Sequence, residues 1–454
     1  MSNGLPQGWI ETTLDDVCSI ITDGTHQTPK YVPGGVPFIS TTNLRPFSVG
    51  FDFSEYKRFI SIREHTELTK RCRPEFGDIL ISKCGTIGRV KEVDVDFPFS
   101  IFVGLALLKL HKGIFQPKFA EYWLNSPKVT DQFESLAPGS TRRTLTLKGI
   151  KTVVVPIPPI PEQQRILAKL EKLLGKVNAS QKRLAKISVI LKRFRQAVLD
   201  TACSGCLTAD WRDKNHQADA IANETNNYPE LPTSWYWSHI RELFQVETGT
   251  TPPKRDPANY SEVSTECPFF KPTDLDVGAD VREAREWLSK KGEKLARILP
   301  PLTVCVTSIG ATIGKTGLLR VRGSTNQQIN AILPSKEVLP QFVFFFCCSP
   351  YFQHRIIEDS SSTTLPIINK SRFEELEFPV PSLAEQQEIV HRVEKLFALA
   401  DQIEVRYAKA RTQVDKLTQS ILAKAFRGEL VAQDPNDEPA SVLLGKIKDK
   451  KTKH

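Results

Sequence analysis

The sequence predicts an α+β protein in which two pseudo-repeated mixed α/β domains are separated by two long helices that form an antiparallel coiled coil. Two repeated motifs predict this organisation. A Leu-Pro-x-x-Trp motif begins a block of similar length at residues 5–9 and again at residues 231–235. Each block leads into a Glu-Gln-Gln motif, at 162–164 and 385–387, which opens a long charged segment with heptad patterning.

These landmarks divide the chain into six consecutive parts. They are a first domain (1–157), a first long helix (158–207), a polar linker (208–230), a second domain (231–380), a second long helix (381–430) and a mobile basic tail (431–454). The linker is rich in Asn, Asp and Ala, which is typical of a surface connection.

Within both domains, short β-branched and aromatic runs alternate with Gly, Pro and Asn, a pattern typical of mixed α+β structure. The first domain contains Thr-Ile-Gly at 86–88, and the second repeats it at 312–314. Gly-Ser-Thr at 139–141 corresponds loosely to Ser-Ser-Thr at 361–363. Residues between these landmarks differ widely, as expected when one scaffold carries two specificities.

The helical segments follow the landmarks with a four-three spacing of apolar residues. Prolines before Glu162 and Glu385 prevent either helix from extending backwards. The predicted coiled-coil seam consists of Ile166, Leu170, Leu173, Val177, Leu184, Ile187, Leu191, Phe194 and Val198 in the first helix, and Ile389, Val393, Leu396, Ile403, Tyr407, Val414, Leu417 and Ile421 in the second.

A helix of about 40 residues is roughly 60 Å long, and a small domain cannot cover its apolar seam. The two seams most economically bury each other, with one domain at each end of the pair. A parallel pairing, or pairing with a second chain, remains open at this point.

Composition places the chain among globular proteins and favours a polyanionic partner. Hydrophobic residues make up 40% of the 454 residues, and the formal net charge is +9 with a pI near 9.0. The N-terminus lacks the features of a secretory signal, and no apolar stretch is long enough to cross a bilayer, so we expect a cytoplasmic protein. The nine scattered cysteines indicate reduced thiols.

Motifs of catalysis and metal binding are missing from the sequence. Residues 310–316 resemble a phosphate-binding loop, but three residues separate the glycines where the nucleotide motif has four. Cys203 and Cys206 have metal-site spacing without a second pair. The Asn/Asp-Pro-Pro-aromatic tetrapeptide of amino-methyltransferases is missing as well. We therefore predict a non-catalytic chain without a metal site, in which Glu162 and Glu385 complement the helix dipoles.

Two kinds of loop are candidates for binding DNA. One kind is rich in hydroxyls and is followed by cations, and the other is a Gly/Thr/Pro loop that ends in cations; both suit phosphates or base edges. A solvated loop is the plainer interpretation of each. The candidate residues are Thr25, His26, Thr28, Lys30, Ser140, Thr141, Arg142, Arg143, Lys148, Thr250, Thr251, Lys254, Arg255, Ser362, Thr363, Thr364, Lys370 and Arg372.

A further segment, 325–328, carries the amides of Asn326, Gln327 and Gln328. Such amides suit the edge of adenine, and buried amides at a strand end explain them equally well.

Together, the duplicated motifs resemble the specificity subunit of type I restriction-modification systems. The resemblance covers nearly the whole chain, and it is carried above all by Pro-Pro-Ile-Pro-Glu-Gln-Gln (158–164) and Pro-Ser-Leu-Ala-Glu-Gln-Gln (381–387) before the long helices. It implies two target-recognition domains, 1–157 and 231–380, each of which reads one half of a split DNA sequence.

The resemblance also implies the partners. Two methyltransferase subunits would carry S-adenosylmethionine and methylate adenine at N6, and restriction subunits would use ATP and magnesium to cleave DNA away from the site. None of these cofactors is expected in this chain. The alternative is a stand-alone coiled-coil DNA-binding or scaffold protein without enzyme partners.

Overall fold

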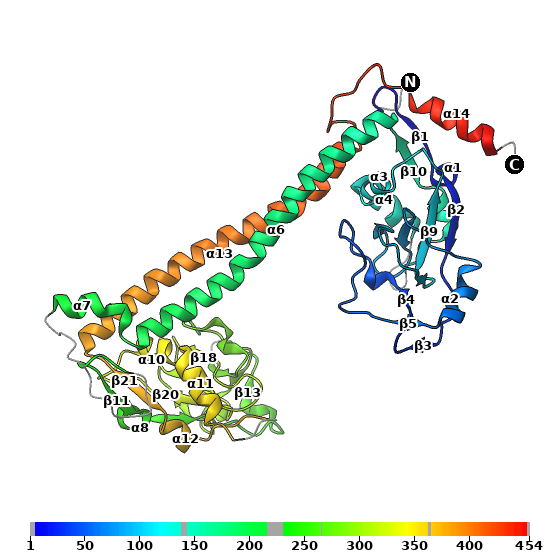
Figure 1. The fold of residues 1–454 in the computed structure, drawn as a ribbon. Coiled ribbons are helices and arrows are strands. Elements are labelled where there is room, and N and C mark those ends of the chain that lie inside the picture. The colour runs from blue at the N-terminus through cyan, green and yellow to red at the C-terminus, as the bar shows by residue number, and fades with distance from the viewer. Residues whose placement is uncertain (1–4, 138–142, 216–229, 265, 362–364, 452–454) are drawn as a thin grey trace. The chain divides into compact units, whose positions relative to one another are not determined.

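The computed structural model describes residues 5–137, 143–215, 230–264, 266–361 and 365–451 (Figure 1). The chain forms two compact units, one made of 1–184 with 409–454 and the other of 185–408. Each unit contains one domain together with half of each long helix. The predicted domain order is therefore seen in the secondary structure, but the compact units cut through the helices.

In the first unit, the central element is an antiparallel sheet with strand order β2-β9-β6-β7, accompanied by a smaller sheet, β3-β5-β4-β8, and the pair β1-β10. The strands are β1 (Ile10–Thr13), β2 (Cys18–Asp23), β3 (Tyr31–Val32), β4 (Val36–Ile39), β5 (Phe59–Ile60), β6 (Ile79–Ser82), β7 (Val90–Glu92), β8 (Ser100–Ile101), β9 (Leu105–Leu110) and β10 (Val154–Ile157). The helices of the domain are α1 (Leu14–Val17), η1 (Thr41–Asn43), α2 (Ile62–Thr69), α3 (Pro117–Leu124), α4 (Pro127–Leu136) and α5 (Leu147–Lys151).

The second unit repeats this topology. Its central sheet has the order β12-β20-β17-β18, and it is accompanied by β13-β15-β14-β19-β16 and the pair β11-β21. The strands are β11 (Tyr236–His239), β12 (Val246–Thr248), β13 (Tyr260–Ser261), β14 (Cys267–Phe270), β15 (Trp287–Leu288), β16 (Ile298–Leu299), β17 (Val304–Thr307), β18 (Thr316–Leu318), β19 (Gly323–Thr325), β20 (Ile329–Ile332) and β21 (Glu377–Val380). The helices are η2 (Cys206–Thr208), α7 (Ala209–Lys214), α8 (Ile240–Leu243), η3 (Pro257–Asn259), η4 (Asp274–Val277), α9 (Lys290–Glu293), α10 (Pro340–Cys347), α11 (Pro350–Glu358) and α12 (Lys370–Glu374).

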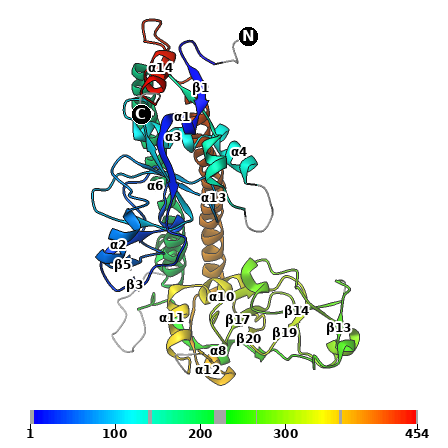
Figure 2. The ribbon, with the colours of Figure 1, turned by 90° about the vertical axis from the view of Figure 1, so that its right-hand side faces the viewer.

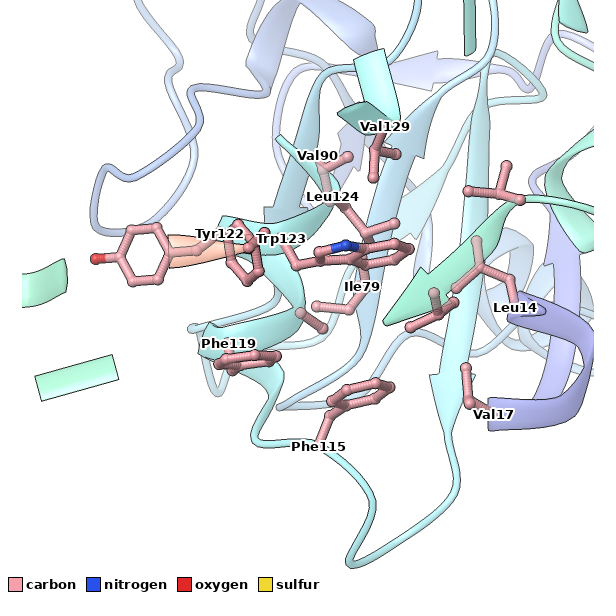
Figure 3. Close-up of a cluster of buried hydrophobic side chains, with 14 of the residues drawn as sticks. Leu14, Val17, Ile79, Val90, Phe115, Phe119, Tyr122, Trp123, Leu124 and Val129 are labelled. Atoms are coloured by element: carbon pink, nitrogen blue, oxygen red, sulfur yellow. The ribbon is translucent and has the colours of Figure 1, made fainter. Parts of the chain in front are cut away.

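The main core of the first domain lies between the central sheet and the helices that cover it. Pro117 and Pro127 occupy the first turns of α3 and α4, where a missing N–H costs nothing. Trp123 of α3 is buried beside Ile79 of β6 and Val90 of β7 (Figure 3). This packing fixes the strands whose ends carry the candidate loops.

The long helices are α6 (Ile160–Cys203) and α13 (Leu383–Ala425), of 44 and 43 residues (Figure 1, Figure 2). In the first unit, Gln181 Nε2 donates to Asp415 Oδ1 at 3.0 Å. In the second unit, Arg195 Nη2 contacts Asp401 Oδ1 at 2.6 Å and Glu404 Oε2 at 2.9 Å. In the first unit Arg165 also pairs with Asp437, beyond the end of α13, and in the second Arg392 Nη1 donates to Leu207 O at 2.9 Å, beyond the end of α6. Within each unit, residue numbers therefore rise along one helix as they fall along the other, which confirms the predicted antiparallel pairing there. Neither helix, nor any other described helix, is long and apolar enough to span a bilayer.

The predicted seam is confirmed at the helix starts and wrong in part further along. Its buried members are Ile166, Leu170, Val177, Leu191, Val198, Ile389 and Val393, and its half-buried members are Leu173, Leu184, Ile187, Phe194, Leu396, Tyr407, Val414 and Ile421. Ile403 and Leu417 are instead 38% and 45% exposed, whereas Leu174 and Leu422 are buried. A strict seven-residue repeat drifts by about 20° per heptad on a straight helix, so the buried stripe moves to the following residue.

Two predicted boundaries need correction. The polar linker was expected to start at 208, but Thr208 and Arg212 of η2 and α7 are buried. The tail from 431 was expected to be mobile, but it contains α14 (Ala440–Lys451), whose Ala440 and Leu444 join the core of the first unit. Both segments are rich in polar residues, and the few that pack against the protein do not form a pattern that the sequence reveals.

Candidate nucleic-acid interface

One edge of the first central sheet gathers loops that are far apart in sequence. At this edge β2 and β6 end and β9 begins. Gly24 N donates to Leu105 O at 3.2 Å, Lys83 N donates to Gly104 O at 2.7 Å, and Leu145 N donates to Lys83 O at 2.8 Å. We call residues 24–30, 84–89, 102–104 and 143–146 the first loop edge.

The second central sheet has a matching edge. Gly249 N donates to Ile329 O at 3.1 Å, Ser308 N donates to Gln328 O at 2.7 Å, and Ile368 N donates to Ser308 O at 2.9 Å. These bonds correspond one for one to those of the first unit. We call residues 249–255, 309–315, 326–328 and 365–368 the second loop edge.

The first loop edge rests on an ionic cluster in which Asp23 and Lys83 are buried and Arg71 and His26 are exposed. Asp23 Oδ2 accepts from Lys83 Nζ at 2.5 Å, and Asp23 Oδ1 contacts Arg71 Nη2 at 2.5 Å and His26 Nε2 at 3.3 Å. Burial raises the pKa of Asp23, but hydrogen bonding and charge attraction from Lys83, with smaller contributions from His26, more than offset it and hold the pKa below its usual 3.8. Asp23 is therefore an anionic anchor for the loop that follows it.

The corresponding anchor in the second unit is uncharged. Thr248 lies where Asp23 lies in the first sheet, and its Oγ1 donates to Asn330 Oδ1 at 2.7 Å. Ser308 replaces Lys83 in the same backbone pairing. The scaffold is conserved between the two units while the side chains beneath the loops differ.

The structure places several predicted residues of the first domain at its loop edge. Thr25 is half-buried and its Oγ1 donates to Gln27 O at 3.0 Å, while His26, Thr28 and Lys30 are exposed. Arg143 turns back onto α4, where its Nε donates to Ala137 O at 2.9 Å and its guanidinium pairs with Glu134. Lys148 is an exposed residue of α5. Ser140, Thr141 and Arg142 lie outside the described residues.

In the second domain, Thr250 and Thr251 are half-buried in the second loop edge, and Lys254 and Arg255 are exposed there. Lys370 and Arg372 belong to the short helix α12. Arg372 instead lines a cavity of about 540 Å³ with His239, Arg355 and Glu377, so the structure does not bring it to the loop edge. Ser362, Thr363 and Thr364 lie outside the described residues.

The Gly-rich segment 310–314 is a turn of the second loop edge. Gly314 N donates to Thr307 O at 2.8 Å, and both Gly310 and Gly314 have positive φ. Lys315 Nζ pairs with Asp276 at 2.6 Å. Within the described ranges, no group of three or more His, Cys, Asp or Glu could hold a metal ion.

Sequence reasoning missed the contacts that fasten each domain to the helices. Trp9 Nε1 donates to Glu162 Oε2 at 2.9 Å, and Gln163 Nε2 donates to Ile114 O at 2.9 Å. The left-handed Gly428 lies against Pro6, leaving no room for a Cβ. We call Pro6, Trp9, Glu162, Gln163 and Gly428 the first closure.

The second closure repeats the first with Pro232, Trp235, Glu385, Gln386 and Gly205. Trp235 Nε1 donates to Glu385 Oε2 at 2.8 Å, and Gln386 Nε2 donates to Glu337 O at 3.1 Å. Gly205 lies against Pro232 in the same way. The paired recurrence of Leu-Pro-x-x-Trp and Glu-Gln-Gln was the available signal that these motifs meet.

Comparison with known proteins agrees with the duplicated architecture. The family model described as "Type I restriction modification DNA specificity domain" matches residues 6–189 and 232–409. The specificity subunit of the type I restriction enzyme EcoBI from Escherichia coli is 34% identical over 328 residues, which cover 68% of this chain and 66% of that protein. The EcoKI specificity subunit from Escherichia coli K12 is 28% identical, with 99% of this chain and 97% of that protein covered.

Among solved structures, a chain from a study of complex assembly and conformational transition of the type I R-M system has a TM-score of 0.67. It is 19% identical, and the match covers 94% of this chain and 99% of that one. This likeness supports the fold. Since the family model matches both repeats, the chain belongs to the type I restriction-modification DNA specificity family, as a non-catalytic DNA-recognition subunit.

Proposed function

We propose that each domain reads one half of a bipartite DNA target through its loop edge. The observation that carries this proposal is that one backbone framework presents different side chains in the two units. Residues 102–104 of the first loop edge are Phe-Val-Gly, and the residues in the same backbone position of the second, 326–328, are Asn-Gln-Gln. Two copies of one scaffold with different surfaces suit two different half-sites.

The exposed cations of the loop edges suit the DNA backbone. Lys30 follows the first Gly/Thr/Pro loop, and Lys254 and Arg255 follow the second. Phosphate contacts from such residues position a protein on the duplex, while side chains that reach base edges supply specificity. Loops joined to a rigid sheet allow both tasks in one surface.

The chain would act together with enzyme subunits. Its relatives are named as specificity subunits of type I restriction enzymes. Two methyltransferase subunits would bring S-adenosylmethionine and methylate adenine at N6 in each half-site. Restriction subunits, where present, would use ATP and magnesium to cleave DNA away from the site. This chain would recognise the target sequence and bind none of those cofactors.

Single-molecule mapping of N6-methyladenine tests the proposal. DNA would come from cells that express this chain with its methyltransferase partner, and from cells that express the partner alone. A new split motif, with a fixed unspecific gap and a methylated adenine in each half, is the expected result. An active partner with no added methylation would contradict the proposal and favour the stand-alone binder or scaffold.

A further inference from the structure

The sharpest chemical difference between the two loop edges lies in the turn that precedes β9 and β20. Leu105 and Ile329 begin these strands, and each accepts a backbone bond from the glycine of the facing loop. Val103 therefore corresponds to Gln327. The first turn offers an apolar side chain at this position, and the second offers an amide that can both donate and accept hydrogen bonds.

The amide of Gln327 is exposed and is held by a neighbouring hydroxyl. Thr251 Oγ1 donates to Gln327 Oε1, which ties the side chain to the facing loop. Among the described residues, Nε2 of Gln327 takes part in no hydrogen bond. One lone pair of Oε1 and both protons of Nε2 therefore remain for a ligand.

The turn behind Gln327 is rigid. Buried Asn326 donates from Nδ2 to Gln328 Oε1 at 2.7 Å, and its Oδ1 accepts from Gln328 N at 3.2 Å. A Cβ on Gly249 would lie 2.2 Å from Asn326 O, so only glycine allows the facing loop to lie this close. Side chains held on such a support keep the geometry that base recognition needs.

We propose that Gln327 reads an adenine in the half-site of the second domain, an inference that rests on the proposed function. In the major groove adenine presents the N7 acceptor beside the N6 amino donor. Nε2 of a glutamine can donate to N7 while its Oε1 accepts from N6. Guanine presents two acceptors in the same positions and cannot satisfy Oε1. Val103 makes no such pair, so the first half-site lacks this contact.

Methylation by the complete complex provides the test. The substrates are duplexes that carry the mapped target, and duplexes in which each base pair of the two half-sites is replaced in turn. The variants are Gln327→Ala and the nearly isosteric Gln327→Glu, which loses both protons of Nε2. Gln245→Ala is the matched control, because Gln245 is an exposed glutamine of the same domain that immediately precedes β12, at the end of the strand away from the loop edge.

The expected result is that both Gln327 variants lose roughly 10-fold or more of the preference for adenine at one position of the second half-site. The base preference at the first half-site should remain as in the wild type in both Gln327 variants. The control variant should keep the wild-type base preference at both half-sites. Unchanged preference at every position in Gln327→Glu would overturn the inference. A wild-type complex that yields no split motif would instead reject the proposed function, so the two failures are distinguishable.

Discussion

The two closures share their geometry and differ in the partners that their buried glutamate has. In the second closure, Oε1 of Glu385 accepts from Thr208 Oγ1 at 2.7 Å and from Arg212 Nη1 at 2.6 Å, in addition to the tryptophan bond on Oε2. In the first closure, Oε1 of Glu162 accepts no hydrogen bond from the described residues. One carboxylate is an ion-paired anion, and its counterpart is held by a single indole.

The difference shows that duplication preserved the fastening while its electrostatics diverged. Burial raises the pKa of Glu162 above its usual 4.5, and the Trp9 bond and the Arg165 charge oppose this only in part. Because the folded state holds its proton more tightly than the unfolded state, Glu162 contributes less stability as the pH rises above 4.5. The first closure is therefore expected to weaken toward neutral pH.

The largest effect that would test this comparison is expected from Arg212→Ala. Removal of one partner leaves Glu385 as a buried, under-compensated charge, which typically costs about 3–5 kcal/mol. Denaturant unfolding with hydrogen exchange of α7 and the start of α13 would measure the loss. Arg255→Ala, at an exposed site of the same unit, is the control and should have almost no effect. If the two variants are equally stable, the ion pair between Arg212 and Glu385 does not stabilise the second closure.

A second test compares Glu385→Gln with Glu162→Gln. The first change removes a charged acceptor from an arginine and is expected to destabilise its unit by about 1.5–3 kcal/mol. The second change keeps an acceptor for the indole and removes the ionisable group. We expect it to leave stability at pH 7 unchanged or slightly higher, and to flatten the fall in stability that accompanies a rise in pH above 4.5. Thermal unfolding across that range measures both, and a steeper pH dependence in Glu162→Gln would refute the assignment.

Replacement of the tryptophan should destabilise the first closure more than the second, which is the reverse of the order expected for the glutamate variants. Trp9→Phe leaves the Glu162 carboxyl with neither of its oxygens bonded, whereas Trp235→Phe leaves Glu385 with Thr208 and Arg212. For the lost hydrogen bond, we expect the free energy of unfolding to fall by about 2 kcal/mol in Trp9→Phe and by about 1 kcal/mol in Trp235→Phe. The loss of ring volume is the same in both variants, and Trp235→Phe also weakens the contact of its ring with the Arg212 guanidinium, 6.0 Å from the ring centroid. The difference between the variants is therefore a lower bound on the difference between the two hydrogen bonds. Unfolding midpoints that shift in the opposite order would contradict the comparison.

The smallest effect is expected at the rim of the first closure. Arg165 is partly exposed and pairs with Asp437 at 2.6 Å. Such pairs contribute at most about 1 kcal/mol. Arg165→Ala should therefore lower the free energy of unfolding only a little. It should also raise the pKa of Glu162 further, because a nearby positive charge is removed. Titration of Glu162 by carbon-13 NMR checks this direction.

Much of the architecture could be predicted because it repeats. Two occurrences of the same motifs predicted two domains and two long helices, and the heptads predicted their pairing. The seam positions Ile403 and Leu417 were wrong because a heptad pattern records spacing but not the slow rotation of a straight helix. The role of Glu162 was incomplete because its partner Trp9 lies 153 residues away, and a local interpretation finds only the helix dipole.

The loop edges could be predicted only as separate segments. Thr25 and residue 84 follow different strands, and the order β2-β9-β6-β7 places those strand ends at one edge. No local pattern contains that order. Gln327 was recognised as an amide suited to adenine, but its support by Thr251 and Asn326 depends on the folded backbone.

The core of the first unit has a consequence for the order in which the protein is made. Phe426 packs on Phe119 at a ring-centroid distance of 5.4 Å, and Leu422, Ala425 and Leu444 are buried in the same cluster. The second unit, in contrast, is one continuous stretch of chain, 185–408. During synthesis, the domain within 1–184 must wait for residues 409–454 before its core is complete. A ribosome that stops between these two units of sequence, after residue 408 and before Leu422, would therefore leave the first unit without part of its core while the second unit already has all its residues.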